Sequence, residues 1–144
     1  MPPSCVQVWR LAVVTGRSLA DVAVTIDDVR QIVGRLERSY EVVVRDRVKF
    51  RVGSIVYLAF SEDDTIMGFA FPKEERDALV AARPDTFRLP RASDMRFNWV
   101  VVWLAMIDLD ELYELVIDAW SMVVPKKLVT AYRLIERAEG RFDD

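Results

Sequence analysis

Apolar residues recur at regular spacings from Val24 onward, and the spacing changes from helical to strand-like and back along the chain. Thr25 is a good N-cap, and Asp27 and Asp28 would lie favourably in the first turn of a helix. The apolar positions that follow are three or four residues apart: Ile26, Val29, Ile32, Val33 and Leu36. This pattern predicts an amphipathic helix over 26–38.

Strand patterns follow this helix. Val48, Phe50 and Val52 alternate with basic residues, which is typical of a half-buried strand. Turn-forming residues at Gly53-Ser54 and at 62–64 then separate three apolar segments. We therefore expect strands over 48–52, 55–60 and 66–71, followed by a helix over 73–83 that Pro72 begins and Pro84 ends.

The second half of the chain predicts further strands and two more helices. The segment 97–107 is rich in tryptophan and valine, which favours a strand. Asp108 with Glu111 resembles a capping box that opens a helix through about Val124, with Trp120 on its core side. Pro125 ends that helix, and a last one runs toward Gly140.

The predicted order is α-β-β-β-α-β-β-α-α. Short turns between successive strands indicate antiparallel pairing. We therefore expect an α+β domain over 24–144 with two layers, an antiparallel five-stranded sheet and helices packed on one face.

The first part of the chain, 1–23, has a different character. Its short apolar stretch is broken by Thr15, Gly16 and Arg17, so it does not match a signal peptide. We expect an N-terminal arm that is either disordered or the product of a start codon chosen too far upstream. The alternative is a helix that docks through Trp9, Leu11 and Val14.

Composition narrows the chemistry. The chain has 144 residues, a formal net charge of −3, no histidine and one cysteine, Cys5. Without histidine it lacks the commonest general base and metal ligand, and one cysteine cannot complete a zinc site of the usual kind. We expect no catalytic residues, no cofactor and no metal. A single cysteine also suits a reducing compartment, so the expected location is cytoplasmic, without membrane association.

Three segments resemble the MmcQ/YjbR family. They are VKFRVGSIVYLAF at 48–60, PKEERDALV at 72–80 and NWVVVWLAMIDLDELYELVIDAWSMVVPKKL at 98–128. The resemblance covers about 25–135 and looks closest to the actinobacterial branch, which fits a chain in which arginine is much commoner than lysine. It implies a frataxin-like or secretion-chaperone-like two-layer fold and a DNA-binding label, with no defined catalytic residues. The chain departs from the family pattern at 93–96 and at Phe71-Pro72.

The candidate binding surface is a row of cations. Arg45, Arg47, Lys49 and Arg51 occupy alternate positions of a predicted strand, so their side chains should leave one face of the sheet. If Trp99 and Trp103 project from the same face, with Phe97 beside them, aromatic rings would lie beside cations. Single-strand binders that use a sheet stack bases on such rings and hold the phosphates with such cations.

Three functions stay open at this point. The first is a non-enzymatic module that binds nucleic acid or another anionic ligand through the basic face, with Lys126 and Lys127 as a further basic spot. The second is a protein-interaction or chaperone-like homodimer with no nucleic-acid role, in which that face is solvated or covered by the second copy. The third is an enzyme that works through carboxylates and arginines.

Overall fold

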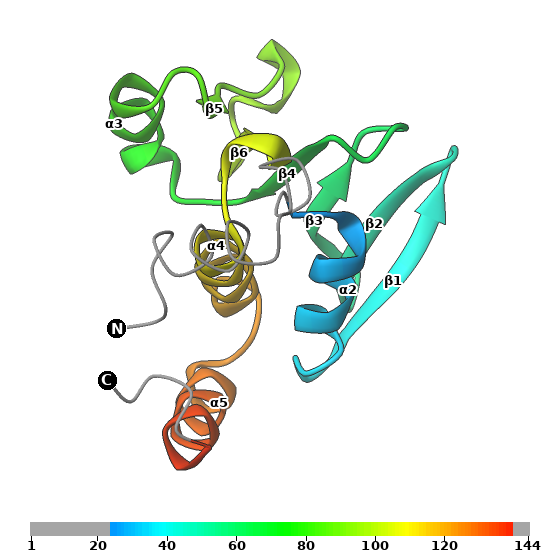
Figure 1. Ribbon diagram of the computed structural model, residues 1–144, viewed down its shortest axis with the longest axis vertical. Coiled ribbons are helices and arrows are strands. Elements are labelled where there is room, and N and C mark those ends of the chain that lie inside the picture. The colour runs from blue at the N-terminus through cyan, green and yellow to red at the C-terminus, as the bar shows by residue number, and fades with distance from the viewer. Residues whose placement is uncertain (1–23, 140–144) are drawn as a thin grey trace, which may run out of the picture.

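The computed structural model describes residues 24–139, so the predicted arm over 1–23 lies outside the described residues. This part of the chain forms one antiparallel sheet with helices beside it (Figure 1). The helices are α2 (Ile26–Val33), α3 (Lys73–Ala82), α4 (Leu109–Ser121) and α5 (Lys126–Ala138). The strands are β1 (Ser39–Val44), β2 (Arg47–Val52), β3 (Ile55–Phe60), β4 (Ile66–Ala70), β5 (Phe87–Arg88) and β6 (Trp99–Trp103).

The sheet has the order β1-β2-β3-β4-β6-β5, and every neighbouring pair is antiparallel. The α+β class and the antiparallel pairing are confirmed, but the prediction of five strands is wrong because the described part of the sheet has six. The missed strand is β1, at the sheet edge. Its Val42, Val43 and Val44 do not alternate with polar residues, and Val43 is 66% exposed. An edge strand with solvent on both faces does not need the alternation of apolar and polar residues on which the prediction relied.

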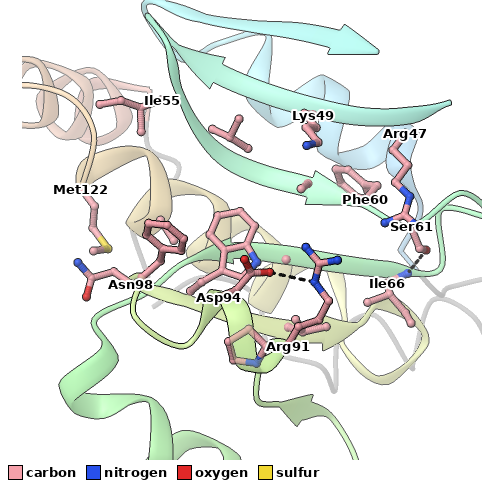
Figure 2. Close-up of a pocket in the computed structure, with 18 of the residues that line it drawn as sticks. Arg47, Lys49, Ile55, Phe60, Ser61, Ile66, Arg91, Asp94, Asn98 and Met122 are labelled. Atoms are coloured by element: carbon pink, nitrogen blue, oxygen red, sulfur yellow. Dashed lines mark hydrogen bonds and ion pairs between the residues drawn. The ribbon is translucent and has the colours of Figure 1, made fainter. Parts of the chain in front are cut away.

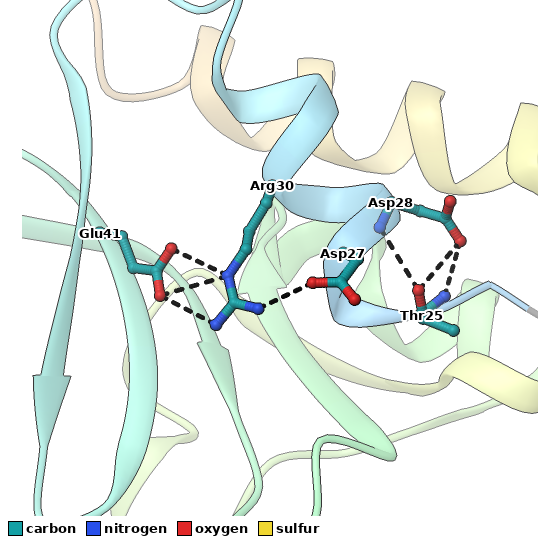
Figure 3. A network of polar contacts seen from close by, with 5 residues as sticks. All are labelled: Thr25, Asp27, Asp28, Arg30 and Glu41. Atoms are coloured by element: carbon teal, nitrogen blue, oxygen red, sulfur yellow. Dashed lines mark hydrogen bonds and ion pairs between the residues drawn. The ribbon is translucent and has the colours of Figure 1, made fainter.

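Helix α2 begins as predicted and ends earlier. The Thr25 hydroxyl and the Asp28 carboxylate cap each other's backbone N–H groups (Figure 3). The helix stops at Val33 rather than at 38, because Gly34 caps it and Arg38 adopts a positive φ of 69° on the way into β1. The Arg30 guanidinium joins α2 to β1 by donating from Nε to Glu41 Oε1 over 3.1 Å.

The core lies between one face of the sheet and helices α2 and α4. Side chains at alternate positions of the strands are almost fully buried there: Phe50, Leu58, Phe60, Met67, Phe69, Val100 and Val102. From the helix layer, Trp120 is 1% exposed and donates its indole N–H to the Glu37 carbonyl over 3.0 Å. The inner face is therefore closed by helices.

The predicted strand over 97–107 is shorter than expected. It ends at Trp103, where a 3₁₀ helix, Leu104–Met106, turns the chain toward α4. Asp108 caps α4 as predicted by accepting from the Glu111 backbone N–H over 2.9 Å. No helix within residues 24–139 combines the length and apolarity needed to cross a membrane.

Helices α3 and α5 lie at opposite ends of the molecule. Figure 1 shows α3 beside β5 and β6, and α5 beyond the end of α4. The Tyr132 ring of α5 packs edge-on against Trp120, with ring centroids 5.6 Å apart. Neither helix covers the middle of the sheet's second face, which is the face that carries the basic residues.

Candidate functional site

The face of the sheet opposite the core, here called the outer face, carries one continuous row of residues across five strands. Strand register pairs Lys49 with Ala59, Ala59 with Gly68, Gly68 with Val101, and Val101 with Arg88. Paired residues of antiparallel strands project from the same face. The row is therefore basic at both ends and made of small or branched apolar residues between them.

A cavity of about 850 Å³ lies on this outer face and is open to solvent on one side (Figure 2). We call it the groove. Its floor is formed by residues of the sheet: Val56, Ala59, Gly68, Ala70, Trp99 and Val101. One wall carries Arg47 and Lys49 of β2, and the other is the segment 88–98 between β5 and β6. The volume is in the range of ligand sites in proteins.

Trp99 lies directly on Gly68. A Cβ built on Gly68 would come within 2.6 Å of Trp99 Nε1 and 2.8 Å of two carbons of the same indole. The indole can therefore lie across β4 only because residue 68 has no side chain. Trp99 is partly exposed and lines the groove, so it presents an aromatic surface there.

Helix α3 fixes the wall that faces β2. The Arg76 side chain is 5% exposed and donates to three backbone carbonyls: Phe97 at 3.0 Å, Trp99 at 3.1 Å and Met95 at 2.9 Å. Lys73 adds its backbone N–H, which donates to Asn98 Oδ1 over 3.0 Å. These charge-assisted hydrogen bonds to the carbonyls of every second residue hold the segment 95–99 in one conformation.

The two ends of the groove differ in chemistry, as Figure 2 shows. Arg47 lies at one end and Lys49 and Arg91 lie near the middle, whereas Ile55 and Met122 lie at the other end. Among the described residues that line the groove, four are cationic (Arg47, Lys49, Arg88 and Arg91) and one is acidic (Asp94). Asp94 is paired with Arg91 Nε at 3.2 Å, so the field in the groove is positive.

The structure brings together part of the predicted site. Arg47, Lys49, Phe97 and Trp99 all line the groove. The placement of Arg45 in the cationic strand is wrong, because Arg45 and Asp46 form the turn between β1 and β2 with φ of 53° and 65°. A two-residue hairpin of this kind needs positive φ at both central positions, which takes Arg45 out of the pleat.

The remaining predicted residues lie outside the groove. Arg51 and Trp103 share the outer face by strand parity, but they do not line the cavity. The Trp103 ring is covered by the Arg88 guanidinium, 4.9 Å from its centroid. Lys126 and Lys127 are exposed in the first turn of α5 and are not among the lining residues.

Sequence reasoning missed the second wall. Arg88 and Arg91 come from a stretch without helical or strand periodicity, so no pattern pointed to them. Asn98 falls inside the predicted strand over 97–107, but nothing in the sequence marked it as a site residue. Gly68 did carry a signal, because an isolated glycine inside a strand often marks a close approach of another group.

Titratable groups with raised pKa lie elsewhere. Burial raises the pKa of the Asp110, Glu114 and Asp118 carboxyls above the ordinary value, and the nearby Asp108 adds to the effect at Asp110. All three belong to α4 and none lines the groove. Within residues 24–139, no group of histidine, cysteine or acidic side chains could hold a metal ion.

Comparison with known proteins identifies the family of this chain. The chain is a small α+β domain whose antiparallel sheet carries helices on one face and an open groove on the other. A model of the YjbR family matches residues 23–122, and the chain belongs to this MmcQ/YjbR family. The match ends before α5. No curated protein matches the chain.

A solved structure shares the fold. It is the crystal structure of Deinococcus radiodurans protein DR2400, with a DUF419 domain, which is 22% identical with a TM-score of 0.63. The alignment covers 78% of this chain and 88% of that one. At this identity the likeness concerns the fold alone.

Proposed function

We propose that the groove on the outer face binds single-stranded nucleic acid, and that the protein is a binding module rather than an enzyme. The observation that carries the proposal is the position of Trp99, an indole in close contact with Gly68 within a groove that Arg47 and Lys49 border. Aromatic platforms beside a positively charged track are the means by which single strands are bound without sequence readout.

The dimensions of the outer face support this assignment. Arg47 and Lys49 are two residues apart on one strand, so their side chains leave the sheet about 6.6 Å from each other. From β2 to β6 the floor crosses three strand spacings, or about 14 Å, over Ala59 and Gly68. A phosphate backbone along β2 would leave its bases over small residues and within reach of Trp99.

The choice of binding over catalysis is supported by the acidic groups. Asp94, the acid that lines the groove, is held by Arg91. The carboxyls with raised pKa, which general acid or base catalysis would need, lie on α4 away from the cavity.

The whole chain is acidic, with a formal net charge of −3. Long-range attraction to a polyanion is therefore absent, and binding depends on the local cations of the groove. We expect weak binding with a modest salt dependence. With three or four phosphate contacts, the plot of log K against log salt should have a slope of roughly −2 to −3 on a single strand.

The test is a titration of a labelled oligo(dT) at several salt concentrations. The Arg47→Ala/Lys49→Ala variant should have a slope shallower by about 1.4, at about 0.7 for each lost contact. The matched control is Lys126→Ala/Lys127→Ala, which removes the same charge outside the groove and should leave the slope unchanged.

Two results would count against the proposal. One is no binding at low salt, and the other is an equal change of slope in both double variants. The first result would favour the protein-interaction function instead, for which the exposed edge strand β1 is the surface to examine. The second result would mean that basic residues attract nucleic acid without a defined groove.

A further inference from the structure

The side-chain amide of Asn98 is oriented by a backbone donor. The Lys73 N–H donates over 3.0 Å to Asn98 Oδ1, and an N–H group can only donate, so the oxygen must face α3. The nitrogen Nδ2 is then turned away from α3, and Asn98 is an exposed residue that lines the groove. No hydrogen bond from Nδ2 is found to any residue within 24–139. A fixed pair of donors without an acceptor is therefore presented at this wall.

The orientation is held firmly. The backbone carbonyls on both sides of Asn98 accept hydrogen bonds from the Arg76 guanidinium, at 3.0 Å for Phe97 and 3.1 Å for Trp99. The Arg76 side chain is itself 5% exposed and cannot move without leaving these carbonyls unpaired. The backbone of Asn98 and the direction of its amide are thus set before any ligand arrives.

The amide lies at the apolar end of the groove. Figure 2 shows Asn98 near Met122, and Phe97 and Ile55 line the same cavity with exposures of 50% and 52%. The cations lie toward the other end and the middle. A flat apolar ring with an acceptor on its edge suits the Asn98 end, and an anionic group suits the Arg47 end. A nucleotide unit has both parts.

We propose that Asn98 donates a hydrogen bond from Nδ2 to the exocyclic carbonyl of an unpaired base, and so makes the groove prefer keto bases over amino bases. This inference rests on the proposed binding of single strands. Thymine and cytosine share a ring size and present opposite groups at C4, and the other differences between them, such as the C5 methyl of thymine, stay the same when Asn98 variants are compared. Thymine carries the O4 acceptor where cytosine carries the N4 amino donor. Opposite Nδ2, the first forms a hydrogen bond and the second places donor against donor.

The experiment compares the affinities of labelled oligo(dT) and oligo(dC) of equal length at one low salt concentration. One hydrogen bond predicts a preference of the wild-type protein for oligo(dT) of roughly 2- to 10-fold. Asn98→Ala should abolish the preference. Asn98→Asp keeps an oxygen for the Lys73 N–H but presents an acceptor to the groove, so the preference should turn toward oligo(dC).

The ratio of the two affinities is the decisive quantity, because the added negative charge of Asn98→Asp lowers the affinity for both oligonucleotides alike. Equal affinities in the wild type, a preference for oligo(dC), or the same ratio in all three proteins would overturn the role of Asn98. Those results would leave single-strand binding itself intact. Failure of both oligonucleotides to bind would instead reject the proposed function.

Discussion

Two neighbouring rows of the same sheet have opposite chemistry. The inner row, Phe50, Leu58, Phe69 and Val100, crosses four strands on the core side, and each of its members is at most 1% exposed. The outer row, Lys49, Ala59, Gly68 and Val101, crosses the same strands one residue away. Helices α2 and α4 close the inner row, whereas a loop and an indole border the outer one. The same strand pairing thus places the core on one face of the sheet and the candidate binding surface on the other.

The difference shows what each face requires. Bulky side chains fill the inner face because helices pack on it and voids are costly. On the outer face, Ala59 and Gly68 are small, and the space that they leave is partly used by Trp99. A sheet face that is only exposed to solvent does not require a glycine at position 68, since it can carry polar side chains of any size. Gly68 is required on that face because the Trp99 indole lies against it.

The largest predicted effect separates adjacent residues of β2. Phe50 is 1% exposed and packs edge-on against Phe60 at 6.0 Å, so Phe50→Ala should lower the free energy of unfolding by about 3–5 kcal/mol. Lys49→Ala, one position away on the outer face, should change it by about 0.5 kcal/mol or less. Urea unfolding followed by circular dichroism measures both. Similar losses in the two variants would mean that the faces are not distinct in energy.

A smaller effect is expected at Gly68. The Cβ of Gly68→Ala would overlap the Trp99 indole, so the ring must move and the unfolding free energy should fall by about 1–3 kcal/mol. The affinity for oligo(dT) should fall as well, because the platform is displaced. Thermal unfolding and the oligonucleotide titration are measured on the same samples.

Gly34→Ala is the control for this variant. Gly34 has φ of −59° at the end of α2, and its Cβ would lie 3.3 Å from the Arg30 carbonyl oxygen. Neither residue lines the groove. Gly34→Ala should leave the affinity unchanged. If Gly68→Ala also left the affinity for oligo(dT) unchanged, Trp99 would not contribute to binding.

The inner face could be predicted from the sequence because burial imposes a pattern. The apolar residues at alternate positions, Val48, Phe50 and Val52, predicted a strand with one buried face. The capping residues Thr25 and Asp108 indicated where two helices begin. The edge strand β1 was missed since neither of its faces is buried enough to impose alternation.

The groove was predicted in part for the same reason. Arg47 and Lys49 follow from strand parity alone, whereas Asn98 is placed by a tertiary contact. Arg76 holds the segment 95–99 through backbone carbonyls, and carbonyls are present at every residue, so the sequence does not indicate which ones Arg76 binds. The prediction for Arg45 was wrong because this residue lies in a turn and not at the start of the strand.

The most direct test of the central claim compares two tryptophans of the same strand and the same face. Trp99 lines the groove, whereas Trp103 lies outside it beneath the Arg88 guanidinium. If a base stacks on Trp99, then Trp99→Ala should weaken the binding of oligo(dT) by about 1–3 kcal/mol without changing the salt slope. Trp103→Ala should bind like the wild type. Equal losses in the two variants, or a loss at Trp103 alone, would contradict a binding groove built around Trp99.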